Sequence, residues 1–114
     1  MKILQSISNP GQILPLFHRG ELTCLIGRGK DTDAQLEDKG VSREHAVLFD
    51  LPGDDTVVRD LNSTNHTRIN GAVIKKGKLK PDDEIKFASL AFRYKIVDSI
   101  PKAGIEPNDK TECL

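Results

Sequence analysis

The chain has 114 residues, of which 37% are hydrophobic and 30% charged, a composition typical of one folded domain with no room for a second. Its 17 basic and 17 acidic residues balance, which argues against the strongly basic surface of a general nucleic-acid binder. The longest apolar run, residues 46–49, is far shorter than the ~20 residues of a membrane-spanning helix, so neither membrane nor nucleic-acid partners are expected.

Apolar residues recur mostly at alternate positions, and clusters of Gly, Pro, Asn and Asp interrupt the chain at short intervals. This pattern predicts an all-β sandwich, because alternation puts one face of each strand in a core and the other in water. In chain order, strands are expected over residues 2–7, 12–17, 22–26, 45–51, 56–60, 67–69, 84–87 and 90–96. No segment has the apolar spacing of a helix.

The strand expected over residues 45–51 places His45, Val47 and Phe49 on one face. That alternation predicts an inward-facing, hydrogen-bonded structural histidine rather than a catalytic or metal-binding one. Cys24 lies in an apolar stretch and is expected to be a small buried hydrophobe. Two cysteines are too few to staple the fold, which favours a reducing compartment such as the cytoplasm or nucleus, and no zinc spacing is visible. No metal or cofactor is expected.

Two stretches are expected to be ordinary solvated chain. Residues 98–114 combine prolines and scattered charge without alternation, so we predict a domain over residues 1–97 followed by a disordered tail or linker. The lysines of the other stretch are interpreted as solvated surface; they are Lys75, Lys76, Lys78 and Lys80.

Three polar elements stand where expected strands meet loops: Gly27-Arg28, Ser42-x-x-His45, and residues 60–65 followed by Thr67 and the Asn70-Gly71 turn. An arginine after a strand-ending glycine offers a donor fork suited to phosphate or carboxylate. Ser42, Thr64 and Asn65 add further donors on turns. If these loops converge at one end of the sandwich, donors outnumber acceptors and the ligand should be an anion.

In this order and spacing, the motifs resemble the forkhead-associated (FHA) domain, a phosphothreonine-peptide reader. The resemblance spans roughly residues 22–97. It implies an FHA-type β-sandwich of about eleven mostly antiparallel strands with ligand loops at one end, and no enzymatic activity. The expected phosphopeptide-binding residues are Arg28 and Ser42 on the phosphate, Arg43 as a further ligand contact, Thr64 at the phosphothreonine or its pocket, and Asn65 on the peptide main chain.

The resemblance also implies structural support for this site. His45 would brace the loop that presents Ser42, and Gly27 would let its strand end without crowding Arg28. Thr67 and Gly71 would support the neighbouring loop. One position departs from the family pattern: His66 stands where glycine is usual, so a residue with a Cβ must adopt a tight-turn conformation that is easy for glycine.

These residues predict a monomeric, phosphothreonine-dependent interaction module for signalling, whose partner is a phosphorylated protein and, indirectly, the Ser/Thr kinase that modifies it. Acids in the flanking loops lead to the hypothesis that acidic ligand residues near the phosphothreonine are disfavoured; they are Asp31, Asp33, Glu37 and Asp38.

Two alternatives stay open. One is an FHA-like scaffold that binds proteins or dimerises without reading phosphate, although such a member would be expected to lose Arg28 or Ser42, and both are present. The other, less favoured, is a small hydrolase using Ser42 and His45. That reading lacks a G-x-S-x-G turn, and the segment 27–30 lacks the Ser or Thr that follows the lysine of a nucleotide-binding loop.

Overall fold

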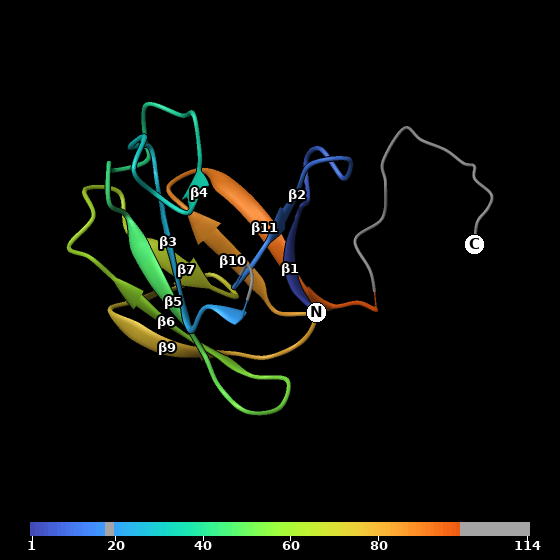
Figure 1. The fold of residues 1–114 in the computed structure, drawn as a ribbon. Helices are drawn as coiled ribbons and strands as arrows, with labels where there is room; N and C mark the ends of the chain where they lie inside the picture. Colours follow the sequence, from blue (N-terminus) through green and yellow to red (C-terminus); the bar gives the residue numbers. More distant parts are fainter. Residues whose placement is uncertain (18–19, 99–114) are drawn as a thin grey trace.

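This computed structural model describes residues 1–17 and 20–98, in which eleven β-strands are joined by turns and loops (Figure 1). The strands are β1 (Lys2–Ser6), β2 (Ile13–Pro15), β3 (Thr23–Gly27), β4 (Ala34–Gln35), β5 (Ala46–Asp50), β6 (Thr56–Asp60), β7 (Thr67–Ile69), β8 (Ala72–Ile74), β9 (Lys76–Leu79), β10 (Glu84–Phe87) and β11 (Leu90–Ile96). The tail predicted at residues 98–114 lies, except for Asp98, outside the described residues, as does Cys113.

The strands form two sheets, ordered β2-β1-β11-β10-β7-β8 and β4-β3-β5-β6-β9. Only the pairing of β3 with β4 is parallel among the described strand pairs. The prediction of an all-β sandwich with about eleven mostly antiparallel strands is confirmed. Within residues 1–17 and 20–98, the structure offers no helix capable of crossing a membrane.

The core lies between the two sheets and contains large side chains from both. Tyr94, Phe87 and Phe92 of one sheet are fully buried, as is Leu48 of the other. Fully burying one such side chain stabilises the fold by roughly 1.5–3 kcal/mol. Cys24 is buried as expected, and that burial raises the pKa of its thiol to about 11, so it remains a protonated core residue.

The expected facing of the strand that contains β5 was wrong. Ala46 and Leu48 of β5 are fully buried, whereas Val47 and Phe49 on the other face are only half-buried. The inner face therefore carries the smaller side chains, a choice that alternation alone does not reveal. His45 is nevertheless fully buried, because it precedes β5 and is covered by loops and by the ring of Phe87, 5.8 Å away and perpendicular to it.

Three short strands were not predicted individually: β4, β8 and β9. β9 falls within the lysine-rich stretch, where Leu79 is buried while Lys76 and Lys78 are exposed. β9 is an edge strand, and lysines on an edge discourage pairing with other chains. The four lysines of that stretch are exposed, as expected.

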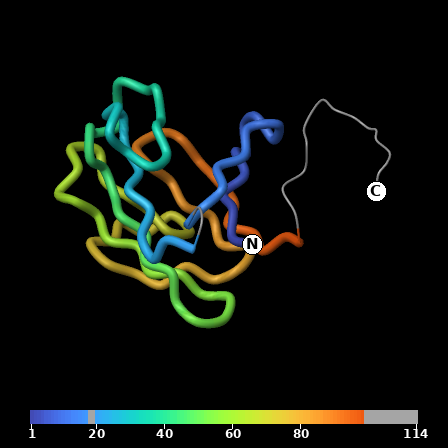
Figure 2. Tube along the Cα trace, viewed as in Figure 1, coloured from blue at the N-terminus to red at the C-terminus, as the bar shows by residue number. Residues whose placement is uncertain are grey.

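The antiparallel order of β3, β5 and β6 puts three loops at one end of the sandwich. The register aligns Ile26 of β3 with Ala46 of β5 and Ala46 with Asp60 of β6. Consequently the β3–β4, β4–β5 and β6–β7 loops gather there, while the β5–β6 turn lies at the opposite end, at the bottom of the trace in Figure 2. The polar motifs of the sequence lie on these three loops.

Candidate functional site

Arg28 follows the last residue of β3 and is held by the β4–β5 loop. Its backbone N–H donates to the carbonyl of Ser42 at 2.9 Å, and its Nε donates to the carbonyl of Val41 at 3.0 Å. The hydrogen bonds of the described residues leave both terminal nitrogens of the guanidinium unbonded. The side chain is thus anchored at Nε, and its outer donor pair is available to an anion.

Gly27 is required where the β4–β5 loop lies against the end of β3. A Cβ at this position would lie 2.1 Å from the carbonyl oxygen of Arg43 and 2.9 Å from that of Ser42. A side chain at this position would therefore crowd the backbone of the β4–β5 loop. The missing side chain lets this loop lie directly on the end of β3, which brings Ser42 to Arg28.

The hydroxyl of Ser42 is oriented by a hydrogen bond that it accepts. The backbone N–H of Thr64 donates to Ser42 Oγ at 3.1 Å, which links the β4–β5 and β6–β7 loops. Because this bond uses an oxygen lone pair, the hydroxyl hydrogen can be donated to a ligand. The bond also places the exposed Thr64 side chain beside Ser42.

His45 links the β4–β5 loop to the β6–β7 loop through its buried imidazole ring. Its Nδ1 accepts the backbone N–H of Ser42 at 3.0 Å, and its Nε2 lies 2.9 Å from the carbonyl oxygen of His66. This geometry assigns the tautomer: Nδ1 is the acceptor, so Nε2 carries the hydrogen and donates to His66. Both ring nitrogens are therefore hydrogen-bonded to the backbone of these two loops.

Asp60 organises the β6–β7 loop from the end of β6, and the sequence interpretation did not assign it a role in the site. Its carboxylate accepts hydrogen bonds from the backbone N–H and hydroxyl of Ser63 and from the hydroxyl of Thr67, the latter at 2.7 Å. Burial opposes ionisation, but these hydrogen bonds outweigh it and hold the pKa of Asp60 below its usual value. An aspartate three residues before a serine is a recognisable turn signal that could have identified the pair.

Asn65 spans the gap to the β4–β5 loop, where its Nδ2 donates to the carbonyl of Gly40 at 2.8 Å. The next residue, His66, has a φ of 71°, the left-handed conformation expected at this position. Gly71 is not brought to this site, because its turn joins the far end of β7 to β8. Its φ of 89°, after 51° at Asn70, is that of a tight hairpin turn.

A hollow of about 360 Å³ lies between these loops, lined by Arg28, Lys39, Gly40, Val41, Ser42, Arg43, Thr64 and Asn65. It therefore unites all five expected ligand residues. Lys39 is an additional lining cation that the sequence interpretation did not single out. Three cations and no acid line this hollow, so its chemistry favours an anion.

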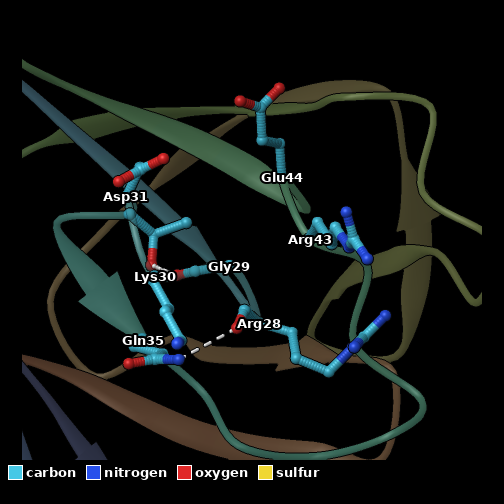
Figure 3. Close-up of a pocket in the computed structure, with 8 residues that line it drawn as sticks. Arg28, Gly29, Lys30, Asp31, Gln35, Arg43 and Glu44 are labelled. Carbon is cyan, nitrogen blue, oxygen red and sulfur yellow. Dashed lines mark hydrogen bonds between the residues drawn. The ribbon is translucent and has the colours of Figure 1, made fainter.

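A larger hollow of about 720 Å³ adjoins the first and shares Arg28 and Arg43 with it. Figure 3 shows the guanidinium groups of both arginines extending to the same side of this pocket, while the carboxylate of Glu44 points away from them. Gln35 donates through Nε2 to the carbonyl of Arg28 at 3.0 Å and so fixes the other wall. The two arginines form the boundary between the hollows.

The described part of the chain holds no cluster of three or more His, Cys, Asp or Glu side chains that could bind a metal ion. The chemistry of the site is instead that of hydrogen-bond donors and positive charge. The chain matches the family model of the FHA domain over residues 24–88, which includes all three loops.

Similar proteins share the same region. The chain is 33% identical over 92 residues to the human proliferation marker protein Ki-67, covering 80% of this chain and 3% of Ki-67. It is 41% identical over 62 residues to the FHA domain-containing protein FhaA of Mycobacterium tuberculosis, covering 54% of this chain and 12% of FhaA. The chain thus spans only a small part of these relatives.

Solved structures agree with this assignment. One, from work on phosphothreonine-dependent FHA domain interactions, has a TM-score of 0.74 and 31% identity, covering 86% of this chain and 98% of the other. Mycobacterium tuberculosis EmbR in complex with a low-affinity phosphopeptide has a TM-score of 0.76 and 28% identity, covering 88% of this chain and 25% of EmbR.

Proposed function

The chain belongs to the FHA domain family, and on that basis we propose that it binds phosphothreonine-containing segments of partner proteins in signalling. One observation carries the proposal: the unbonded terminal nitrogens of Arg28 and the available hydroxyl hydrogen of Ser42 belong to the same hollow. The similar structures, whose subjects include phosphothreonine-dependent interactions and a phosphopeptide complex, support it.

The phosphate would be recognised by charge-assisted hydrogen bonds. Phosphothreonine carries about −1.5 to −2 charges near neutral pH and three acceptor oxygens. Arg28 would donate to two of these oxygens and Ser42 to the third, with Arg43 and Lys39 adding positive charge at the rim. At roughly 1.5–3 kcal/mol for each hydrogen bond to a charged group, these contacts would favour the phosphorylated peptide about a thousandfold.

Asn65 would hold the peptide main chain through its side-chain amide. Nδ2 donates one of its two hydrogens to Gly40, so Oδ1 can accept an N–H from the bound peptide and the second Nδ2 hydrogen can donate to a peptide carbonyl. Thr64 would lie beside the phosphothreonine, since its own N–H positions Ser42 Oγ. Asp60 and His45 would act only through these loops.

A binding role is favoured over hydrolysis by the bonds of His45. A catalytic histidine would accept the proton of the serine hydroxyl, whereas Nδ1 here accepts the backbone N–H of Ser42 and Nε2 donates to His66. We propose a module without catalytic activity, metal or cofactor. We further propose that it is monomeric, does not bind nucleic acid, and meets the product of a Ser/Thr kinase in the cytoplasm or nucleus.

The decisive test compares a phosphothreonine peptide with its unphosphorylated counterpart by fluorescence anisotropy. The wild type should prefer the phosphorylated peptide by at least about a hundredfold. Ser42→Ala should lower that preference by about tenfold, since one charge-assisted hydrogen bond is lost. Ser89→Ala, an exposed serine between β10 and β11, is the matched control. Equal binding of both peptides to the wild type would instead support the phosphate-independent scaffold.

A further inference from the structure

A third hollow, of about 460 Å³, lies on the other side of the β6–β7 loop and shares no lining residue with the hollow that contains Arg28 and Ser42. It is lined by Arg59, Asp60, Asn62, Lys75 and Lys76. Arg59 of β6 is the register partner of Lys76 of β9, so their side chains lie on the same face of the sheet. That face is the outer one, because both residues are exposed while the adjacent Val58 is fully buried.

The charge of this hollow is positive and largely uncompensated. Arg59, Lys75 and Lys76 face a single lining acid, Asp60, whose carboxylate already accepts hydrogen bonds from Ser63 and Thr67. The ion pairs found in residues 1–17 and 20–98 are Lys2–Asp50 and Lys78–Asp55, so none of the three cations takes part in one. Like charges directly opposite on neighbouring strands destabilise a sheet, which an anionic ligand would relieve.

The third hollow lies close to the hollow that contains Arg28 and Ser42, which we call the phosphate hollow. Asn62 lines the third hollow and Thr64 lines the phosphate hollow, and the two residues are only two positions apart on one loop. Their Cα atoms are thus separated by at most about 7–8 Å. Since an extended peptide advances about 3.3 Å per residue, a ligand crossing this loop would reach the second hollow within roughly two to five residues of its phosphothreonine.

The opposite flank of the site has another character. Asp31 and Glu44 line the larger hollow on the β3–β4 side, where they offset part of its positive charge. The β6–β9 side has an excess of cations. The end of the sandwich is therefore electrostatically asymmetric, and the two flanks of a bound peptide would meet different preferences.

We propose that the hollow of Arg59, Lys75 and Lys76 is a second anion subsite, which binds an acidic or phosphorylated side chain of the same ligand on one flank of its phosphothreonine. This inference rests on the proposed phosphothreonine binding and specifies the class of ligand. The hypothesis from the sequence, that acidic ligand residues near the phosphothreonine are disfavoured, would then apply only to the flank of the ligand that lies on the β3–β4 side of the site.

The test varies the charge of the ligand and the charge of the hollow. Fluorescence anisotropy would measure the affinity of a phosphothreonine peptide with alanine flanks and of a series in which one glutamate occupies each of the six positions on either side. A further peptide would have a second phosphothreonine at the position where glutamate improves binding most. We expect one short window on one flank where glutamate tightens binding by about three- to tenfold, and a second phosphate to tighten it further, since its charge is larger.

The double variant Arg59→Gln/Lys76→Gln should abolish this gain while binding the alanine-flanked peptide nearly as the wild type does. The control Lys86→Gln/Arg93→Gln removes the same charge from β10 and β11 of the other sheet and should retain the gain. Thermal unfolding of each variant checks that it is folded.

Three results would each overturn the subsite. The first is that glutamate improves binding at no position of the ligand, and the second is that the gain from glutamate survives in Arg59→Gln/Lys76→Gln. The third is that both double variants lose the same affinity for the glutamate peptide and for the alanine-flanked peptide, which would indicate only a long-range effect of charge. Failure of the proposed function is distinguishable, because the wild type would then bind the alanine-flanked peptide no better than its unphosphorylated form.

Discussion

The two ends of the sandwich both place cationic and hydroxyl side chains beside backbone carbonyls or N–H groups. At one end the hydrogen-bond donors of these side chains are all used within the chain, whereas at the other end some remain available. At the end with the β5–β6 turn, the ammonium of Lys2 donates to the carboxylate of Asp50 at 2.6 Å and to the carbonyls of Leu51 and Asp55 at 3.0 and 2.6 Å. All three ammonium hydrogens are thus used, and only 10% of the side chain is exposed. At the other end, Arg28 donates once to a carbonyl and keeps its outer nitrogens available.

Tyr94 and Ser42 repeat this contrast with hydroxyl groups. The Tyr94 hydroxyl donates to the carbonyl of Asp54 at 2.7 Å and lies 2.9 Å from Thr56 Oγ1. Burial raises the pKa of Tyr94 to about 12, so it stays neutral. Ser42 Oγ accepts one bond and retains its hydrogen. A polar group whose bonds are completed within the chain supports the fold, whereas a fixed group with a spare donor is suited to a ligand.

Arg28→Ala should produce the largest effect and separate the two ends. We expect affinity for a phosphothreonine peptide to fall by at least about a hundredfold, because the donor pair is lost, while the free energy of unfolding changes by less than about 1 kcal/mol. Calorimetric titration and urea unfolding measure the two quantities. Arg93→Ala, at an arginine of β11 near the opposite end, serves as the control and should leave affinity unchanged. Unchanged affinity in Arg28→Ala would contradict the assignment of the phosphate site.

Lys2→Met should give the reverse result. It leaves the carboxylate of Asp50 and two carbonyls without their donor, so the free energy of unfolding should fall by about 2–3 kcal/mol. Peptide affinity of the folded protein should stay within about twofold of the wild type. Lys95→Met, a half-buried lysine of β11 on the other sheet face, is the matched control. If Lys2→Met were as stable as the wild type, the stability of the end with the β5–β6 turn would not depend on this ammonium.

The pH dependence of stability should also differ between the ends. Because the folded pKa of Asp60 is below its ordinary 3.8, its contribution is complete above that value and is lost as pH falls through the lower folded pKa. Asp60→Asn should therefore reduce stability at pH 6 and differ progressively less from the wild type below pH 4, as measured by urea unfolding. The raised pKa of Tyr94 acts in the alkaline range: its contribution is complete below pH 10 and lost as pH rises through about 12. If the free energies of unfolding of Asp60→Asn and the wild type differed by the same amount from pH 6 to pH 3, ionisation of Asp60 would not explain its contribution to stability.

His66→Gly should have the smallest effect. With φ at 71°, a side chain costs roughly 1 kcal/mol relative to glycine, so the variant should be more stable by about 0.5–1 kcal/mol. His66→Ala keeps the Cβ and should not gain this stability, which separates backbone strain from loss of the imidazole. Thermal unfolding measures both variants. A less stable glycine variant would show that the His66 side chain makes a favourable contact that outweighs its backbone conformation.

Part of the fold and of the site could be predicted from the chain alone. Alternation identified the long strands such as β6 and β11, because a half-buried strand leaves a period of two in its sequence. It failed for β4, which is too short to show a period, and for β8 and β9, whose sequences Ala-Val-Ile and Lys-Gly-Lys-Leu lack a clear alternation of apolar and polar side chains. It also gave the wrong inner face for β5. Gly27, Ser42 and Thr64 were recognisable as members of motifs, but the close approach of the Arg43 backbone to Gly27 was not.

The sequence by itself determined the fold class and the residue types of the site, because alternation and loop chemistry are local properties of the chain. Only the tertiary structure decided which donors remain available. Arg28 and Ser42 are distinguished from Lys2 and Tyr94 by the carbonyls and N–H groups that distant segments bring to them. Likewise, the pairing of β6 with β9 brings Lys76 beside Arg59 and creates a basic hollow from lysines that look like ordinary surface in the sequence. Hydrogen-bond partners and neighbouring charges depend on contacts between segments far apart in the chain, which a local pattern does not encode.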